Sequence, residues 1–291
     1  MTPMVADILI EALPYIRSFF GMTVVVKYGG HAMVDEQLKT DFARDITLLK
    51  FVGMNPVVVH GGGPQINRVL EKMGITTKFV SGMRFTDEQT MDVVEMVLGG
   101  QVNKGIVTQI NQQGGRAVGL SGKDGGLIHA EKLQVTQPAA ENLPPEIIDL
   151  GLVGTVSQVN PHIINTLTAQ GFIPVIAPVG VGPNGETFNI NADLMAAKLA
   201  GAIGAGRLIY LTDVDGILDK AGSLIPSINT RTIRDLIADQ TISGGMIPKI
   251  EYAQDALLNG VRKVQIINGT RRHALLLELY TDKGIGTEVI K

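Results

Sequence analysis

The sequence predicts an α/β fold, a three-layer αβα sandwich built on a mainly parallel open sheet. Two observations support this prediction. Short apolar runs alternate with amphipathic helical patterns along most of the 291 residues, which is the order that repeated strand-helix-strand units give. In addition, two early apolar runs end directly in glycine-rich stretches that lead into a helical pattern, as strand-to-helix connections of a parallel sheet do.

The expected elements follow from these two periodicities. Apolar runs predict strands at 23–27, 56–60, 116–120, 172–179, 207–212 and 264–267. Helical periodicity predicts helices at 36–52, 64–73, 87–113, 192–202, 248–258 and 273–280. Thr86 is the expected N-cap of the longest of these helices. Residues 127–158 give a mixed pattern, in which "QPAAENLPPE" predicts an excursion or a hairpin loop.

An apolar stripe precedes the first strand. Pro14 lies inside the stripe and should kink the helix that carries it. The stripe packs either on its own domain or on another subunit, and the sequence favours neither alternative. Its members recur at helical spacing, and they are Val5, Ile8, Leu9, Ala12, Leu13, Ile16, Phe19 and Phe20.

Length and turn residues predict a two-part organisation. A chain of 291 residues can hold two cores, and "GVGPNG" at 180–185 indicates the division. We therefore expect an N-terminal kinked helix at 1–22, one half at 23–180 and a second half at 181–291. "GVGPNG" also fits G-x-G-x-x-G, but its second part predicts a turn and no helix begins there, so we do not interpret it as a dinucleotide-binding loop.

Composition narrows the function. Hydrophobic residues make up 45% and charged residues 18%, with a formal net charge of -3, so we expect a globular protein that does not bind nucleic acid. The chain has no cysteine, which excludes disulfides and thiolate chemistry. No apolar run reaches the length of a membrane span, and Asp7 and Glu11 stand where a signal peptide would be basic. A cytoplasmic location is the expectation.

Two strand ends suggest a cradle for an anion. Lys27 and His60 each end an apolar run, and glycines at 29–30 and 61–63 follow them. Glycines let backbone N–H groups approach an anion closely, and a following helix adds partial positive charge. A single loop of this kind is most simply a tight turn. Two in succession, one with a lysine, favour phosphate or carboxylate binding.

Further charged residues stand at helix starts. Lys249 falls in the first turn of its helix, where a cation is unfavourable to the helix dipole, so an anionic ligand would explain it. Asp193 also lies in a first turn, where an acid is favourable for structural reasons alone. No G-x-x-x-x-G-K-[ST], G-x-S-x-G or H-E-x-x-H motif occurs in the chain, which excludes the P-loop and the common hydrolase and zinc-protease signatures.

Taken together, the motifs resemble one family. "KYGG", "HGGGPQ", "GMRFTD", "FNINAD", "LTDVDGIL" and "GGMIPK" occur in the order and spacing of the amino-acid kinase family, and the resemblance covers essentially the whole chain. It implies a substrate-binding N-terminal half and an ATP-binding C-terminal half. It further implies transfer of a phosphoryl group from ATP to the γ-carboxylate of N-acetyl-L-glutamate, the second step of acetylated arginine biosynthesis.

The resemblance also implies a role for each matching residue in the transfer step. Lys27 and Lys249 would neutralise charge on the phosphoryl group in flight, and Asp193 would hold both lysines in place. Backbone N–H groups would come from Gly30 and from the glycines of the second loop. Magnesium would bridge the phosphates, held mainly by ATP oxygens and water, so no protein metal ligand is expected.

Binding residues follow from the same resemblance. Gly62 and Gly63 would contact the γ-phosphoryl group and the reacting carboxylate, Arg84 would clamp the α-carboxylate of the substrate, and Asn189 would contact the substrate. The nucleotide would be lined by Leu211, Thr212, Asp213, Val214, Asp215, Gly216, Thr241, Ile242 and Ser243. Because a γ-carboxylate with an ordinary pKa of about 4.3 is already ionised at neutral pH, no general base is required.

The N-terminal stripe resembles the extra helix of the arginine-inhibited branch of the family. The resemblance implies a hexamer formed as a trimer of dimers, inhibited by L-arginine. The matching positions for the arginine site are Tyr15, Lys198, His273, Glu278 and Gly284. A solvated helix face is the alternative explanation for His273 and Glu278. Whether a PII-type signalling protein binds stays open.

Two other functions compete with this interpretation. A kinase of the α-aminoadipate branch would use an acceptor one methylene longer, a difference worth only about 1–3 kcal/mol in a pocket. A non-catalytic sensor of acylglutamate or arginine would keep the fold, but the presence of both lysines and Asp193 argues against an inactive protein.

Overall fold

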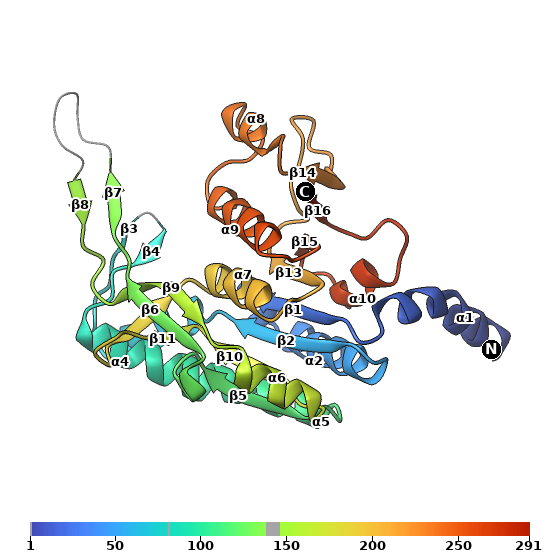
Figure 1. Ribbon diagram of the computed structural model, residues 1–291, viewed down its shortest axis with the longest axis horizontal. Coiled ribbons are helices and arrows are strands. Elements are labelled where there is room, and N and C mark those ends of the chain that lie inside the picture. Colours follow the sequence, from blue (N-terminus) through green and yellow to red (C-terminus); the bar gives the residue numbers. More distant parts are fainter. Residues whose placement is uncertain (1, 81, 138–145) are drawn as a thin grey trace.

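A central sheet organises the chain. The computed structural model describes residues 2–80, 82–137 and 146–291, and Figure 1 shows the sheet among its helices. Six neighbouring strands run parallel, and the edge pair β14 and β16 runs antiparallel to them. In spatial order the strands are β14 (Ser227–Asn229), β16 (Thr287–Ile290), β15 (Lys263–Asn268), β13 (Arg207–Thr212), β1 (Thr23–Tyr28), β2 (Asn55–His60), β10 (Ile173–Ala177) and β5 (Ala117–Ser121).

Alternating side chains of the central strands build one core on each face of the sheet. Val24, Val26 and Val58 belong to one buried cluster, and Val25 and Val57 belong to the other. The first cluster is completed by α2 (Glu36–Phe51), α3 (Gly63–Lys72), α5 (Asn103–Gln112) and α10 (Ala274–Leu279). The second is completed by α6 (His162–Ala169), α7 (Ala192–Ala202), α8 (Ile233–Ala238) and α9 (Met246–Leu258). The predicted three-layer αβα sandwich is therefore confirmed.

Four further strands pair in a closed ring beside the sheet, which the sequence did not predict. They are β6 (Ile128–Lys132), β9 (Val153–Val159), β11 (Val179–Val181) and β12 (Thr187–Ile190). β11 and β12 are antiparallel arms of the hairpin at "GVGPNG", so this loop does not open a helix, as predicted. The expected boundary at residue 180 falls inside β11, and residues 138–145 of "QPAAENLPPE" lie outside the described residues, between β7 (Val135–Gln137) and β8 (Glu146–Ile148).

The helical stretch predicted at 87–113 has three parts. It begins as α4 (Glu88–Glu95), continues as a π-helix, η2 (Met96–Val102), and ends as α5. Thr86 is not its N-cap, because the backbone of Thr86 is bridged to Gly151 and its hydroxyl donates to the Arg84 carbonyl. Asp87 caps the helix instead, since its carboxylate accepts the Thr90 N–H at 2.8 Å.

The N-terminal helix α1 (Thr2–Phe19) extends away from the sheet (Figure 1). Ile8, Leu9 and Leu13 are 57%, 62% and 45% exposed, whereas Phe19 is buried. Most of the stripe therefore does not pack on its own domain, and the side chain of Val5 lies outside the described residues. Within the described part of the chain, no helix combines the length and apolar character that crossing a bilayer requires.

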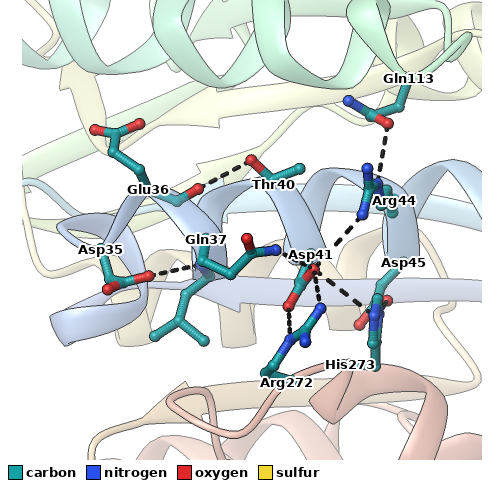
Figure 2. A network of polar contacts seen from close by, with 11 residues as sticks. Asp35, Glu36, Gln37, Thr40, Asp41, Arg44, Asp45, Gln113, Arg272 and His273 are labelled. Atoms are coloured by element: carbon teal, nitrogen blue, oxygen red, sulfur yellow. Dashed lines mark hydrogen bonds and ion pairs between the residues drawn. The ribbon is translucent and has the colours of Figure 1, made fainter.

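A polar network around two buried carboxylates joins the start of α10 to α2 (Figure 2). The Nε atom of Arg272 donates to Asp41 Oδ2 at 2.7 Å, and His273 Nδ1 lies 2.6 Å from Asp45 Oδ1. Both carboxylates are buried, and Arg44 approaches Asp41 from the same helix. We call Asp41, Arg44, Asp45, Arg272 and His273 the α2–α10 joint.

Candidate active site

Two lysines and one carboxylate, carried by three different elements, meet in the structure. Lys27 stands near the end of β1, Asp193 in the first turn of α7 and Lys249 in the first turn of α9. The Nζ atom of Lys27 is 3.0 Å from Asp193 Oδ1, and the Nζ atom of Lys249 is 2.5 Å from Asp193 Oδ2. The structure therefore brings together three residues that the sequence placed on three separate elements. We call them the lysine pair with Asp193.

Local structure fixes the position of the carboxylate. Asn191 is the N-cap of α7, and its side-chain oxygen accepts the N–H groups of Asp193 and Leu194 at 2.8 and 3.2 Å. Tyr210 is a fully buried residue of β13, and its hydroxyl donates to the Asp193 carbonyl at 3.1 Å. Asp193 is thus anchored at its backbone, which leaves the carboxylate free to bridge the lysines.

The charges at this centre do not cancel. Burial by itself raises the pKa of Asp193, but the Coulomb attraction of Lys27 and Lys249 outweighs it and lowers that pKa to about 2. Burial is also the main reason why the pKa of Lys249 falls below its usual value. Two cations against one carboxylate leave one positive charge in excess, which suits an incoming anion.

The glycine loops after β1 and β2 are tied to each other. The N–H of Gly61 donates to the Tyr28 carbonyl at 2.8 Å. Gly30 has a φ of 69°, and a side chain there would overlap the Asp213 carboxylate, which accepts the His31 N–H at 2.7 Å. A side chain at Gly62 would press within 2.5 Å of Leu98. Both glycines are therefore required for close backbone approach.

The first residue of α3 faces open space. A Cβ added to Gly63 would meet nothing within 4 Å, although the residue begins a helix whose first N–H groups have no partner inside the helix. Gly63 thus presents a helix N-terminus to whatever occupies the space beside it, as an anion-binding loop does.

Arg84 and Asn189 line one cavity of about 260 Å³, together with Leu194 of α7 and Tyr252 of α9. Arg84 is 6% exposed, and its Nη2 donates to Asn67 at 2.5 Å. Its Nη1 has no hydrogen-bond partner among the described residues. Since an unsatisfied buried donor is costly, this nitrogen is available to an acceptor such as a carboxylate.

The nucleotide-lining residues of the prediction lie in two loops of the C-terminal half. Those at 211–216 run from the end of β13, where Thr212 contacts Val214 and Asp215 pairs with Arg271 at 3.0 Å. Those at 241–243 run into α9, so they precede Lys249 by a few residues along the chain. Gly216 has a φ of 143°, and a side chain there would meet Thr287 at 2.5 Å.

A second cavity, of about 570 Å³, lies between α1 and α10. Tyr15, Glu278 and Gly284 all line it, and the Tyr15 hydroxyl donates to Asp282. Gln265 donates to Glu278 Oε1 at 2.5 Å, while two backbone N–H groups reach Oε2. We call this the α1–α10 cavity. The structure brings three of the five residues predicted for an arginine site to it.

Lys198 and His273 do not line the α1–α10 cavity, so the structure does not bring these two of the predicted residues to it. Lys198 points from α7 to α9, where it pairs with Asp255 at 3.0 Å. His273 adopts a left-handed conformation, φ 53°, which turns its ring toward Asp45 in the α2–α10 joint. Helical spacing alone could not show either contact, because both partners come from distant elements.

Sequence reasoning also missed the residues that hold the predicted ones in place. Asn67 positions Arg84 and Gln265 positions Glu278. Neither amide is part of a motif used in the sequence analysis, so no signal there identified its role. Only the folded arrangement shows that these amides orient charged groups in the two cavities.

Comparison with known proteins decides the family. A family model described as "Amino acid kinase family" matches residues 22–268. The chain belongs to the amino acid kinase family. The lysine pair with Asp193 and the glycine loops lie within the matched residues.

Individual relatives extend this result to nearly the full chain. An acetylglutamate kinase from Syntrophobacter fumaroxidans is 58% identical over 286 residues, covering 98% of this chain and 96% of the relative. Among solved structures, N-acetylglutamate synthase from Neisseria gonorrhoeae with coenzyme A and N-acetyl-glutamate matches with a TM-score of 0.85 and 27% identity. The same synthase with coenzyme A and L-arginine matches with a TM-score of 0.80 and 26% identity.

The similarity to the synthase covers nearly all of this chain but only part of the synthase. It covers 98% of this chain but only 63% and 65% of the two synthase chains. The chain therefore spans less than two thirds of that larger protein, and the part in common has the fold of the amino acid kinase family.

Proposed function

We propose that the chain transfers the γ-phosphoryl group of ATP to the γ-carboxylate of N-acetyl-L-glutamate, giving N-acetyl-L-glutamyl 5-phosphate and ADP. The observation that carries the proposal is the lysine pair with Asp193, which has one excess positive charge and whose Lys27 Nζ lies beside Gly29 of the first glycine loop. The high identity to a named acetylglutamate kinase over nearly the whole chain supports the same activity. The reaction is a step of arginine biosynthesis.

The lysines act on charge rather than on protons. The acceptor carboxylate is ionised at neutral pH, so it attacks the γ-phosphorus directly while the bond to the β–γ bridging oxygen breaks. Lys27 approaches from the N-terminal half and Lys249 from the C-terminal half, so both flank the group in transfer. The attraction of both ammonium groups to Asp193 offsets the repulsion between them. Backbone N–H groups of the glycine loops supply the remaining stabilisation.

Binding of the two substrates divides between the halves. The unpartnered Nη1 of Arg84 would take the α-carboxylate of the acylated amino acid, with Asn189 beside it in the same cavity. The loops at 211–216 and 241–243 would line ATP. Mg²⁺ would be held mainly by phosphate oxygens and water, because the nearby carboxylates of Asp213 and Asp215 already have protein partners.

A trapping assay tests the activity directly. An acyl phosphate reacts with hydroxylamine to give a coloured hydroxamate, so we expect ATP-dependent hydroxamate with N-acetyl-L-glutamate. The Lys249→Ala variant should yield almost no hydroxamate. Lys132→Ala is the control and should match the wild type, because Lys132 is an exposed lysine at the end of β6 whose partner is Asp149. Preference for the acetylated acceptor with one more methylene would assign the lysine branch. Nucleotide and acylglutamate binding without hydroxamate would assign a sensor.

We further propose that L-arginine inhibits the enzyme from the α1–α10 cavity and that α1 joins dimers into a hexamer. The cavity combines the Glu278 carboxylate with the cations Arg207 and Lys283, which suits a ligand carrying both a guanidinium and a carboxylate group. The exposed apolar face of α1 supports a subunit contact. The arginine complex of the related synthase supports arginine as the ligand.

Arginine inhibition and assembly have separate tests. Glu278→Gln should raise the arginine concentration for half inhibition at least about tenfold, because it removes the charge that the guanidinium meets, and it should leave turnover without arginine unchanged. Deleting residues 1–21 should leave an active dimer by light scattering. A full-length dimer, or a truncated protein that keeps full arginine inhibition, contradicts the proposal.

A further inference from the structure

His60 is a buried histidine that the transfer mechanism described above does not use. It is the last residue of β2, it is fully buried, and it stands directly before Gly61. Its Nδ1 lies 2.8 Å from the Gly61 carbonyl oxygen, and its Nε2 lies 3.2 Å from Asn103 Nδ2. Both ring nitrogens therefore have a partner, and one partner is the backbone of the second glycine loop.

These partners allow a single protonation state. The Gly61 carbonyl can only accept, so Nδ1 must carry a hydrogen. The Asn103 nitrogen lies 2.9 Å from the Val175 carbonyl and 3.2 Å from the Leu120 carbonyl, which identifies it as the amide donor. Nε2 must then accept, so the ring is neutral with its hydrogen on Nδ1. Burial, the main cause, lowers the pKa of His60 to about 4, which keeps the ring neutral.

The hydrogen bond from His60 fixes a peptide plane. In a trans peptide the carbonyl of one residue and the N–H of the next point in opposite directions. Gly61 is held at its carbonyl by His60 and at its N–H by the Tyr28 carbonyl. Its peptide planes cannot turn freely, and the N–H of Gly62 is therefore aimed away from the ring. Among the described residues, no acceptor is found for that N–H.

We propose that His60 is a positioning residue that aims the N–H of Gly62 at the phosphoryl group in transfer. The inference rests on the proposed function for the identity of the anion, but the aiming itself rests on the contacts of Gly61. Asn103 holds the His60 ring in place. It is the first residue of α5, directly after the π-helix η2, and its side-chain amide contacts His60 and the carbonyls of Leu120 in β5 and Val175 in β10. His60 exchanges no proton in the reaction.

Three variants separate aiming from simple packing. His60→Leu fills the space without a donor, and we expect kcat to fall about 10–100-fold with both KM values nearly unchanged, somewhat less than the loss of a whole donor. His60→Asn places an amide N–H close to the former Nδ1, so it should recover most of kcat. Ile110→Ala removes a buried side chain of α5, and it should lower the melting temperature while keeping kcat. Full kcat in His60→Leu overturns the proposal.

A readout that needs no turnover keeps the test independent of the activity. Neutron diffraction of the full chain with a non-hydrolysable ATP analogue should show deuterium on Nδ1 of His60, none on Nε2, and the Gly62 N–D directed at a phosphate oxygen. Deuterium on Nε2, or a Gly62 N–D that points away from the nucleotide, overturns the inference. If hydroxamate is never formed but the neutron result stands, the proposed substrate fails while the aiming of Gly62 holds.

Discussion

Two clusters of charged side chains, one around the largely buried Asp193 and one around the buried Asp41 and Asp45, differ in their charges. In the lysine pair with Asp193, one carboxylate meets two cations at 3.0 and 2.5 Å. In the α2–α10 joint, two carboxylates meet two arginines and the ring of His273. The first cluster keeps an excess positive charge, whereas the second is close to balanced.

The pKa values of the carboxylates reflect this difference. Two lysines overcome the effect of burial at Asp193 and lower its pKa to about 2. Burial dominates at Asp45, whose pKa rises to about 6 although His273 opposes the shift. A cluster with balanced charges can hold two helices together without a ligand. An excess charge that is largely removed from water is stabilised by an anionic ligand. The excess therefore distinguishes the proposed catalytic centre from the α2–α10 joint.

The largest expected effect comes from removing the excess charge. Lys249→Met leaves Asp193 paired with Lys27 alone, so the centre becomes as balanced as the joint. We expect kcat for hydroxamate formation to fall by at least about 10²-fold, since a charge contact specific to the transition state is lost, with little change in the melting temperature. Lys27→Ala should behave in the same way. Turnover close to that of the wild type in either variant would break the comparison.

Neutralising the joint should change stability and its dependence on pH. The folded pKa of Asp45 is raised, so its contribution is present below the unfolded value of about 3.9 and is lost as the pH rises to about 6. The Asp45→Asn variant does not ionise at this position, so it does not lose stability in this way, and the oxygen of the new amide can still accept a hydrogen bond from His273. Between pH 4 and 6 the free energy of unfolding of the wild type should fall by up to about 3 kcal/mol relative to the variant.

Urea unfolding at several pH values measures this difference. The turnover of Asp45→Asn at pH 7 should stay near that of the wild type, because the joint touches no substrate. An offset between the two proteins that is constant from pH 4 to 6 would show that Asp45 is ionised throughout and that the joint is not dominated by burial.

Arg84 sharpens the comparison as a buried cation that lacks any carboxylate. Its partners are the neutral Asn67 and the ring of Phe79, whose centroid lies 4.7 Å away. Arg84→Lys should raise KM for N-acetyl-L-glutamate about tenfold while KM for ATP stays constant, because an ammonium cannot bind a carboxylate with two parallel N–H donors. Steady-state kinetics with each substrate varied in turn would check this. A selective loss of ATP affinity would contradict the assignment of the two halves.

Much of the fold could be predicted because it depends on patterns among residues that are neighbours in the sequence. The strand at 207–212 and the helix at 192–202 have the predicted bounds, since apolar runs and periodicity are properties of neighbouring residues. The ring of β6, β9, β11 and β12 could not be predicted in the same way. It depends on pairings such as Asn189 with Val153, which bring together segments that are distant in the sequence.

The candidate site divides along the same line. Lys27 and Lys249 stand at positions where a cation has no local reason to be, so the sequence alone singled them out. Asp193 has a local reason as a helix-start acid, and only the fold shows that it also pairs with both lysines. The contact of His273 with α2 was not predicted, because it depends on the left-handed backbone of this residue. Local sequence patterns cannot show such a turn for a residue other than glycine.

The smallest expected effect concerns a balanced pair near the surface. Lys198 and Asp255 form one ion pair between α7 and α9, and about a third of each side chain is exposed. Because solvent screens such pairs, Lys198→Ala should change the free energy of unfolding by no more than about 0.5–1 kcal/mol. Arginine inhibition and kcat should both stay within about twofold of the wild type, since Lys198 lines neither the α1–α10 cavity nor the site of Arg84. Arginine titration of the variant, with Glu278→Gln beside it as the sensitive control, decides the point. A loss of arginine response in Lys198→Ala as large as that in Glu278→Gln would mean that an exposed, balanced pair takes part in regulation, and that excess charge alone does not mark the ligand sites of this chain.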